Sequence, residues 1–267
     1  MKAVSSALVV VASITLATQG VAVCSQETQA KQKQIEHSHV PRSGSLVDRY
    51  FPFRVGQTHS YSVRGESAEG SGQNVRVVPI RGAFSETVLS VQSIAPAMRV
   101  IEVRVAGDAP DYKVCASKSD QVRSSAWTFW YVVHNNRVFS ECTREDVDAL
   151  LEDLRSPPSS PTSLDNLEYQ LPLKAGNSWG HDPASPKRTD TFYEWFVEAK
   201  APVEVPSGKY DDCYRMAYRT LPDHIERWVC SGVGLVAEEY THHGWVHHYR
   251  IELTKLIAAG SSTKQVQ

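Results

Sequence analysis

Short runs in which apolar and polar residues alternate, separated by turn-forming residues, constrain this chain more than any other feature. In the clearest run, residues 99–105, Ile101, Val103 and Val105 share one face, and charged residues lie between them. Because successive side chains of a strand point to opposite faces, such a run has one buried and one solvated side. The pattern therefore predicts a mostly β domain built on an antiparallel sheet. Further runs cover residues 59–64, 74–80, 87–94, 111–116 and 126–134.

One helix is expected to interrupt these strands. Thr143 and Asp146 have the spacing of a capping box at residues 143–155, and apolar side chains follow at helical spacing. A Pro- and Ser-rich segment, residues 156–165, then reads as a linker. The fold class is thus mostly β (α+β) with one short helix around 143–155.

The N-terminal segment is typical of a signal peptide. Lys2 precedes an apolar run, residues 7–17, that is shorter than the roughly 20 residues a membrane-spanning helix needs. We expect an exported protein, periplasmic, at the cell surface or extracellular. An alternative stays open, because residues 21–25 resemble a bacterial lipoprotein box in which Cys24 would be lipidated and anchor the chain to a membrane. Val23 departs from the small residue that this motif places before the cysteine.

The chain divides into segments of different composition. We expect a signal peptide over residues 1–23, a disordered tether over 24–45, a β-rich domain over 46–257 and a disordered tail over 258–267. The 28 Lys and Arg residues against 30 Asp and Glu give a net charge of −2. This balance argues against a nucleic-acid partner bound through excess positive charge.

Four cysteines remain once Cys24 is set aside, and an even number in an exported chain indicates disulfides. Cys213 and Cys230 flank a predicted hairpin with its turn near residues 221–223, and we expect them to pair. A pair of Cys115 with Cys142 needs Cys142 to fold back over the sheet, because a simple meander places the strand around Trp130 between them.

A nine-residue pattern occurs twice. Residues 51–59 match residues 171–179 in residue type at each position, and Gly56 and Gly176 occupy the place of a turn before the next strand. The echo indicates an internal pseudo-repeat, residues 46–155 and 166–257 joined by the linker, or a single large sheet that uses one entry turn twice.

These paired openings, with residues 203–210 and Cys213 and with residues 226–236, resemble a TapB-like family of poorly characterised bacterial exported proteins. The resemblance implies a curved antiparallel sheet, a β-clam or half-barrel similar to that of lipoprotein carriers, an envelope or extracellular location and no established catalytic residues. His59 stands where the family has an aromatic residue after the first Gly, so we expect the first unit to pack less tightly than the second.

Histidines cluster at residues 242–248, where His243-Gly244 suggests a tight two-residue turn. In that register Tyr240 faces His247 and Glu239 faces His248. His242, His248 and Glu239 could then form a zinc site, but solvated turn histidines explain the pattern better. No nucleophile elbow, dinucleotide loop or other catalytic signature occurs, so we predict no catalytic residue, metal or cofactor.

Two aromatic runs, residues 127–133 and 192–197, are apolar on both faces and need cover on both sides. A two-layer core or the packed helix would supply that cover; alternatively, one face lines a groove for a lipid-like or peptide ligand. We predict a non-enzymatic envelope protein that binds such a ligand on a curved sheet. The alternatives are a structural module without a cavity and a metal-dependent enzyme that uses the His242–His248 hairpin. The expected ligand-binding residues are Trp127, Phe129, Tyr131, Tyr193 and Trp195.

Overall fold

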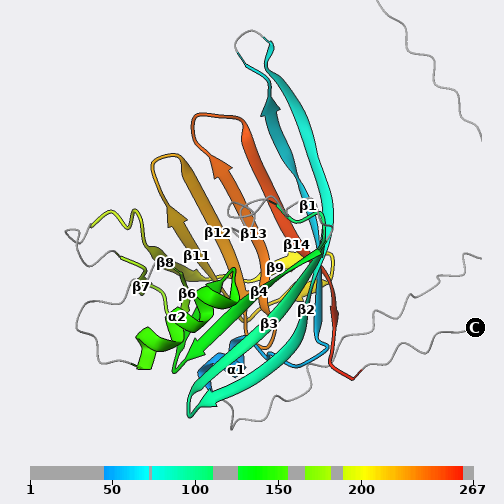
Figure 1. Ribbon diagram of the computed structural model, residues 1–267. Coiled ribbons are helices and arrows are strands. Elements are labelled where there is room, and N and C mark those ends of the chain that lie inside the picture. The colour runs from blue at the N-terminus through cyan, green and yellow to red at the C-terminus, as the bar shows by residue number, and fades with distance from the viewer. Residues whose placement is uncertain (1–44, 72–73, 111–125, 156–165, 182–188, 261–267) are drawn as a thin grey trace, which may run out of the picture. The chain divides into compact units, whose positions relative to one another are not determined.

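The computed structural model describes residues 45–71, 74–110, 126–155, 166–181 and 189–260 (Figure 1). They form a 12-stranded antiparallel sheet in the order β6-β5-β4-β3-β2-β1-β14-β13-β12-β11-β8-β7, and a two-stranded sheet of β9 and β10. The strands are β1 Thr58–Glu69, β2 Arg76–Ala95, β3 Met98–Gly107, β4 Ala126–His134, β5 Arg137–Glu141, β6 Leu167–Gln170, β7 Ser178–Trp179, β8 Trp195–Lys200, β9 Val203–Val205, β10 Gly208–Tyr210, β11 Cys213–Arg219, β12 Asp223–Cys230, β13 Gly234–His242 and β14 His247–Ile257.

The large sheet curves until its two edges meet. Figure 1 shows the strands fanning around a concave side, and the edge strands β6 and β7 contact each other. The predicted mostly β, curved antiparallel fold is confirmed. Each strand is twisted relative to its neighbour, and over twelve strands this twist accumulates into the curvature of the sheet.

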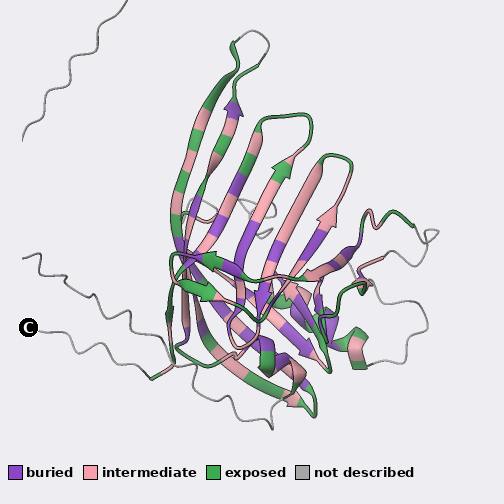
Figure 2. Ribbon diagram, turned by 180° about the vertical axis from the view of Figure 1, so that it is seen from behind, coloured by how far each residue is buried: buried purple, intermediate pink, exposed green. Residues whose placement is uncertain are grey.

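Strand register assigns each residue to one face of the sheet. The predicted inward face of residues 99–105 is confirmed, since Ile101, Val103 and Val105 are each 3% exposed or less. Figure 2 shows buried residues gathered where the strands come together, with half-buried and exposed residues toward the hairpin ends. The inner face therefore carries a large part of the core.

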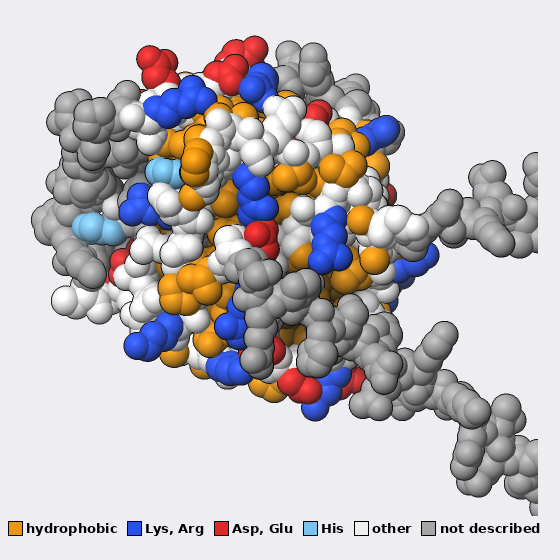
Figure 3. Space-filling view, turned by 90° about the horizontal axis from the view of Figure 1, so that it is seen from below, with side chains coloured by type: hydrophobic (Ala, Val, Ile, Leu, Met, Phe, Trp, Pro, Cys, Tyr) orange, Lys and Arg blue, Asp and Glu red, His pale blue; other side chains and the backbone are white. Residues whose placement is uncertain are grey.

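The outer face of β8 and β11–β14 is charged. Arg215 Nε lies 2.8 Å from Glu198 Oε2, and Arg250 Nε lies 2.8 Å from Glu252 Oε1. Arg250 also pairs with Glu239 across the strands. The outer face of these strands therefore carries charges of both signs. Figure 3 views the molecule from below, where Lys and Arg side chains also stand among hydrophobic ones and some acidic ones.

The predicted helix is α2, Arg144–Arg155, and Thr143 caps its start. The Thr143 hydroxyl donates to Asp146 Oδ2 at 2.7 Å, and the Asp146 amide donates to Thr143 Oγ1 at 3.1 Å. Val147, Leu150 and Leu151 are buried, and the helix contacts β4 and β5. No described helix has the length and apolar character that crossing a membrane requires.

Besides the predicted helix, residues Leu46–Tyr50 form a second short helix, α1, which no sequence pattern indicated. Five residues are too few to show a helical period in a sequence. The structure stabilises α1 through its start, where the Asp48 amide donates to Ser45 Oγ at 3.2 Å, and through the burial of Val47 and Tyr50.

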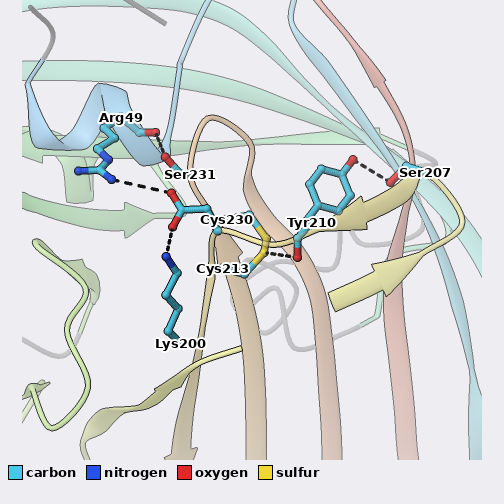
Figure 4. The surroundings of a disulfide bond; sticks show 8 residues. Arg49, Lys200, Ser207, Tyr210, Cys213, Cys230 and Ser231 are labelled. Atoms are coloured by element: carbon cyan, nitrogen blue, oxygen red, sulfur yellow. Dashed lines mark hydrogen bonds and ion pairs between the residues drawn. A yellow bond between two sulfur atoms is a disulfide. The ribbon is translucent and has the colours of Figure 1, made fainter. Parts of the chain in front are cut away.

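The disulfide between Cys213 and Cys230 is confirmed, at a position where the two residues are register partners. It closes the end of the β11–β12 hairpin against which α1 docks (Figure 4). The Gly232 amide donates to the Arg49 carbonyl at 2.6 Å, and Asp212 lies 2.8 Å from Lys200 Nζ and 3.8 Å from Arg49. The hydrogen bond from Lys200 holds the pKa of the Asp212 carboxyl below its usual value.

Two local predictions were wrong. The runs 74–80 and 87–94 belong to one continuous strand, β2, which passes through Gly82. A Cβ at Gly82 would lie 2.8 Å from the Asp108 carbonyl oxygen, so glycine allows the close approach of the backbone there. In the histidine hairpin, Tyr240 faces Tyr249 and Thr241 faces His248. The turn is four residues long instead of two, and the Trp245 indole in it donates to the Ala68 carbonyl at 3.1 Å.

Several predictions fall outside the described residues. These are the signal peptide 1–23, the tether up to residue 44, Cys24, the strand at 111–116, the linker 156–165 and the tail from 261. Cys115 is among them, so its pairing with Cys142 stays a prediction.

Candidate functional site

The two copies of the repeated motif form the same turn. Gly56 and Gly176 have φ of 83° and 90°, in the region that favours glycine. The Gly56 amide donates to the Val88 carbonyl and the Gly176 amide to the Val197 carbonyl, both at 2.8 Å. Each turn therefore begins a strand, β1 or β7, at the same place against its neighbour, β2 or β8.

This equivalence aligns two cross-strand pairs that differ in chemistry. In the first copy His59 is opposite Glu86, and in the second Trp179 is opposite Trp195. Both tryptophans are buried, at 4% and 8% exposure. The second copy thus fills its interior with two indoles, whereas the first has an imidazole and a carboxylate there.

A cavity of about 40 Å³ lies beside the His59–Glu86 pair. Its walls are mostly apolar, with five Phe and Tyr rings among them, and come from the segment after α1, from β1–β4, from β6 and from the β12–β13 turn with the start of β13. The lining includes Phe51, Phe53, Gln57, His59, Tyr61, Glu86, Val88, Val103, Tyr131 and Tyr169. Since one water needs about 10–15 Å³ on this measure, the cavity takes about three water-sized groups.

Polar groups gather on one side of this cavity. His59 Nε2 lies 3.0 Å from the Val233 carbonyl oxygen and 3.4 Å from Gln57 Nε2, and Gln57 is 5% exposed. The other side is aromatic, with ring centroids 4.5 Å apart for Phe51 and Tyr169 and 5.3 Å apart for Phe53 and Tyr131. Pro52, Phe53, His59 and Leu235 are half-buried and form the rim.

The cavity tyrosines keep their protons. Burial raises the pKa of Tyr61, Tyr131 and Tyr169 far above the usual value. The Tyr61 hydroxyl donates to the Leu235 carbonyl at 3.1 Å. These side chains therefore offer neutral rings and hydroxyls across the physiological range.

A buried ion-pair network lies deeper on the inner face. Arg227 Nε lies 2.6 Å from Glu238 Oε2, and Arg227 also pairs with Glu168 of β6. Its guanidinium sits 4.4 Å from the Trp195 ring centroid. Arg227 is 8% exposed and Glu238 fully buried, so the network links β12 and β13 to the opposite edge of the sheet.

Next to this network, a row of apolar side chains crosses five strands on the inner face. Register pairs connect its members in turn: Tyr249, Tyr240, Ile225, Tyr218 and Trp195. The Tyr249 and Tyr240 rings stack at 5.0 Å, and the Tyr218 and Trp195 rings lie at 5.3 Å. Tyr240, Ile225 and Tyr218 are only half-buried. We call this set the aromatic row.

The predicted ligand-binding residues are divided between these features. Phe129 and Tyr131 pack together on the inner face of β4, but only Tyr131 lines the cavity, and Trp127 packs half-buried against the core. Trp195 lies in the aromatic row under Arg227. Tyr193 lies outside β8, 42% exposed. Their ligand-binding role stays a prediction.

The other face of β4 and β5 is covered as well. Val132 and Phe139 are register partners, at 0% and 1% exposure, on the face opposite Tyr131. The helix α2 contacts these two strands and buries its own Val147, Leu150 and Leu151.

The histidine hairpin shows no arrangement for a metal. His247 Nδ1 lies 2.9 Å from Ser67 Oγ, and alternation turns His248 to the other face. Within the described residues, no group of three or more His, Cys, Asp and Glu side chains is placed to hold a metal ion.

Comparison with known proteins gives a likeness of fold only. No family model and no curated protein matches the chain. Among solved structures, a candidate exported protein with a YmcC-like fold from Bacteroides fragilis is 12% identical, with a TM-score of 0.39 over 78% of this chain and 99% of that one. A candidate lipoprotein from Parabacteroides distasonis is 13% identical, with a TM-score of 0.35 over 78% and 98%. The TapB-like resemblance stays a prediction.

Most residues of the cavity and the row were not predicted as a site. The repeated motif gave one indication of the cavity. It aligns His59 with Trp179, so the first copy has a smaller side chain where the second has an indole. The aromatic row gave no such indication, because its members are far apart in sequence and only the register brings them together.

Proposed function

We propose that this protein is a non-enzymatic exported or cell-envelope protein that binds an elongated apolar ligand on the inner face of its sheet. The aromatic row carries the proposal. It presents half-buried Tyr240, Ile225 and Tyr218 between buried ends at Tyr249 and Trp195. Burying apolar surface contributes about 25 cal/mol per Å², so a ligand across these strands gains affinity from area alone.

The row also has means of orienting a ligand. The Tyr240 hydroxyl donates to Asp223 Oδ1 at 2.6 Å, and the His247 ring lies 5.5 Å from the Tyr240 ring. Sparse polar groups on an apolar wall are typical of ligand sites. The leader at the N-terminus supports export.

Ile225→Ser tests this function. The substitution makes the centre of the row polar, and we expect at least a fivefold rise in the Kd of cis-parinaric acid, measured by its fluorescence. Leu221→Ser is the matched control, because Leu221 is 77% exposed in the turn before β12. Native mass spectrometry of protein purified from its source shows whether a lipid co-purifies.

A second candidate is a structural envelope module without a ligand. The small size of the cavity beside His59 favours it, since about 40 Å³ leaves no room there for a lipid-sized ligand. Failure of the wild type to bind cis-parinaric acid, together with a clean apoprotein in the mass spectrum, would favour this module over the binding protein.

A further inference from the structure

We propose that the cavity beside His59 and Glu86 is an aromatic cage that binds a small organic ammonium group. The proposal is independent of the aromatic row, because the two sets of residues do not overlap. It begins from the comparison between the two copies of the repeated motif. Where the second copy has a Trp179–Trp195 pair, the first has His59 and Glu86 and leaves space.

The cavity wall has the composition that recognises an ammonium group. The rings of Phe51, Phe53, Tyr61, Tyr131 and Tyr169 all line it. The negative faces of aromatic rings attract cations, and desolvation strengthens that attraction. Because burial keeps the three tyrosines protonated, their rings and hydroxyls remain neutral donors and acceptors.

Glu86 supplies the opposite charge. It lies on β2 among the lining residues, is 9% exposed, and has the inward-facing Phe84 and Val88 on either side along its strand. An ammonium ion among the rings would be close to this carboxylate in a medium of low dielectric constant, where the charge interaction is strong. Gln57 and His59 add polar atoms on the same side.

Size limits the ligand. An empty cavity of about 150 Å³ holds benzene, whereas this cavity of about 40 Å³ does not. A group of two or three heavy atoms fits, such as methylammonium or dimethylammonium. The half-buried rim at Pro52, Phe53 and Leu235 lets a longer chain bearing such a group extend outward.

The test compares a cation with a neutral molecule of the same size. Dimethylammonium chloride and ethanol, each of three heavy atoms, are titrated separately into the full-length protein, with sodium chloride as the ionic-strength control. Shifts of the Tyr61 and Tyr131 ring protons in NMR report binding. We expect the Kd of dimethylammonium to be at least tenfold lower than that of ethanol. Equal affinities would overturn the proposal.

Two variants test the assignment to Glu86. Glu86→Gln keeps the shape and removes the charge, and we expect the Kd of dimethylammonium to rise at least tenfold. Glu102→Gln is the matched control, because Glu102 lies on the outer face of β3, where the Ser90 hydroxyl donates to its carboxylate at 3.2 Å. The Kd of dimethylammonium for this variant should stay within twofold of the wild-type value. An unchanged Kd in Glu86→Gln sinks the proposal.

A third variant keeps the test valid should Glu86→Gln not fold. Phe53→Leu removes one half-buried ring from the rim, and we expect at least a threefold weaker binding of dimethylammonium. A parallel titration with N-acetyl-lysinamide separates the two sources of an ammonium group: tighter binding than dimethylammonium indicates a lysine side chain, and weaker binding a free amine. Absence of binding for both overturns the cage.

Discussion

At Gly234, a single hydrogen atom in place of a side chain allows the cavity wall to form. Gly234 has φ of +89°, and a Cβ there would lie 3.0 Å from Phe51 Cδ1. The left-handed conformation costs other residues about 1–2 kcal/mol. The contact adds to that, because the Phe51 ring is itself held against Tyr169. Glycine is therefore favoured at this position for two reasons: the left-handed backbone conformation and the space that the Phe51 ring occupies.

We expect Gly234→Ala to lower the free energy of unfolding by more than about 2 kcal/mol in urea titration. Gly232→Ala provides the control, because Gly232 has φ of +77° but no atom within 4 Å of its Cβ position. It should lose only about 1–2 kcal/mol. Equal losses at the two positions would show that Phe51 moves aside without effect.

Among the elements, the β11–β12 hairpin is the one that holds α1 in place. Its disulfide ends the hairpin at the point where Asp212 and Gly232 hold Arg49 of α1. The chain then leaves α1 directly into Phe51 and Phe53. The disulfide thus supports the helix that places the aromatic side chains Phe51 and Phe53 in the cavity wall.

We expect Cys213→Ser to lower the free energy of unfolding by about 3 kcal/mol, from the chain entropy released when a loop with a sequence separation of 17 opens. Chemical denaturation measures it. The double variant Cys213→Ser/Cys230→Ser should show the same loss under oxidising conditions, because one substitution already opens the loop. A double variant that loses clearly more than Cys213→Ser would contradict this account.

At the scale of the whole molecule, the Arg227 network stabilises the curved sheet, because it joins strands that are not neighbours in the sheet. Arg227 of β12 pairs with Glu238 of β13 and with Glu168 of β6, near the opposite edge. Glu238 is fully buried, and its Oε2 lies 2.6 Å from Arg227 Nε. Removing one partner of a buried ion pair leaves an uncompensated charge, which costs about 3–5 kcal/mol.

We therefore expect Arg227→Met to destabilise the protein by about 3–5 kcal/mol, and the double variant Arg227→Met/Glu238→Gln to recover at least half of the loss. Urea unfolding measures both. Arg250→Met is the control, because Arg250 pairs with Glu239 and Glu252 on the outer face and is one-third exposed. Exposed pairs contribute at most about 1 kcal/mol. A similar loss in Arg227→Met and Arg250→Met would contradict the network's role.

The sequence alone determined the features that depend on neighbouring residues. Alternation in residues 99–105 specified an inner and an outer face, the Thr143–Asp146 spacing specified the start of α2, and the hairpin between Cys213 and Cys230 specified their pairing. In each case the cause acts over one strand, one helical turn or one hairpin, so the local pattern contains it.

Only the tertiary structure decided which distant residues meet. The register of five strands assembles the aromatic row, curvature of the sheet brings Arg227 to Glu168, and docking of α1 closes the cavity over His59 and Glu86. A shift of one residue in any strand would turn its side chains to the other face. Register and curvature follow from the packing of the whole sheet, and no single stretch of sequence contains that information.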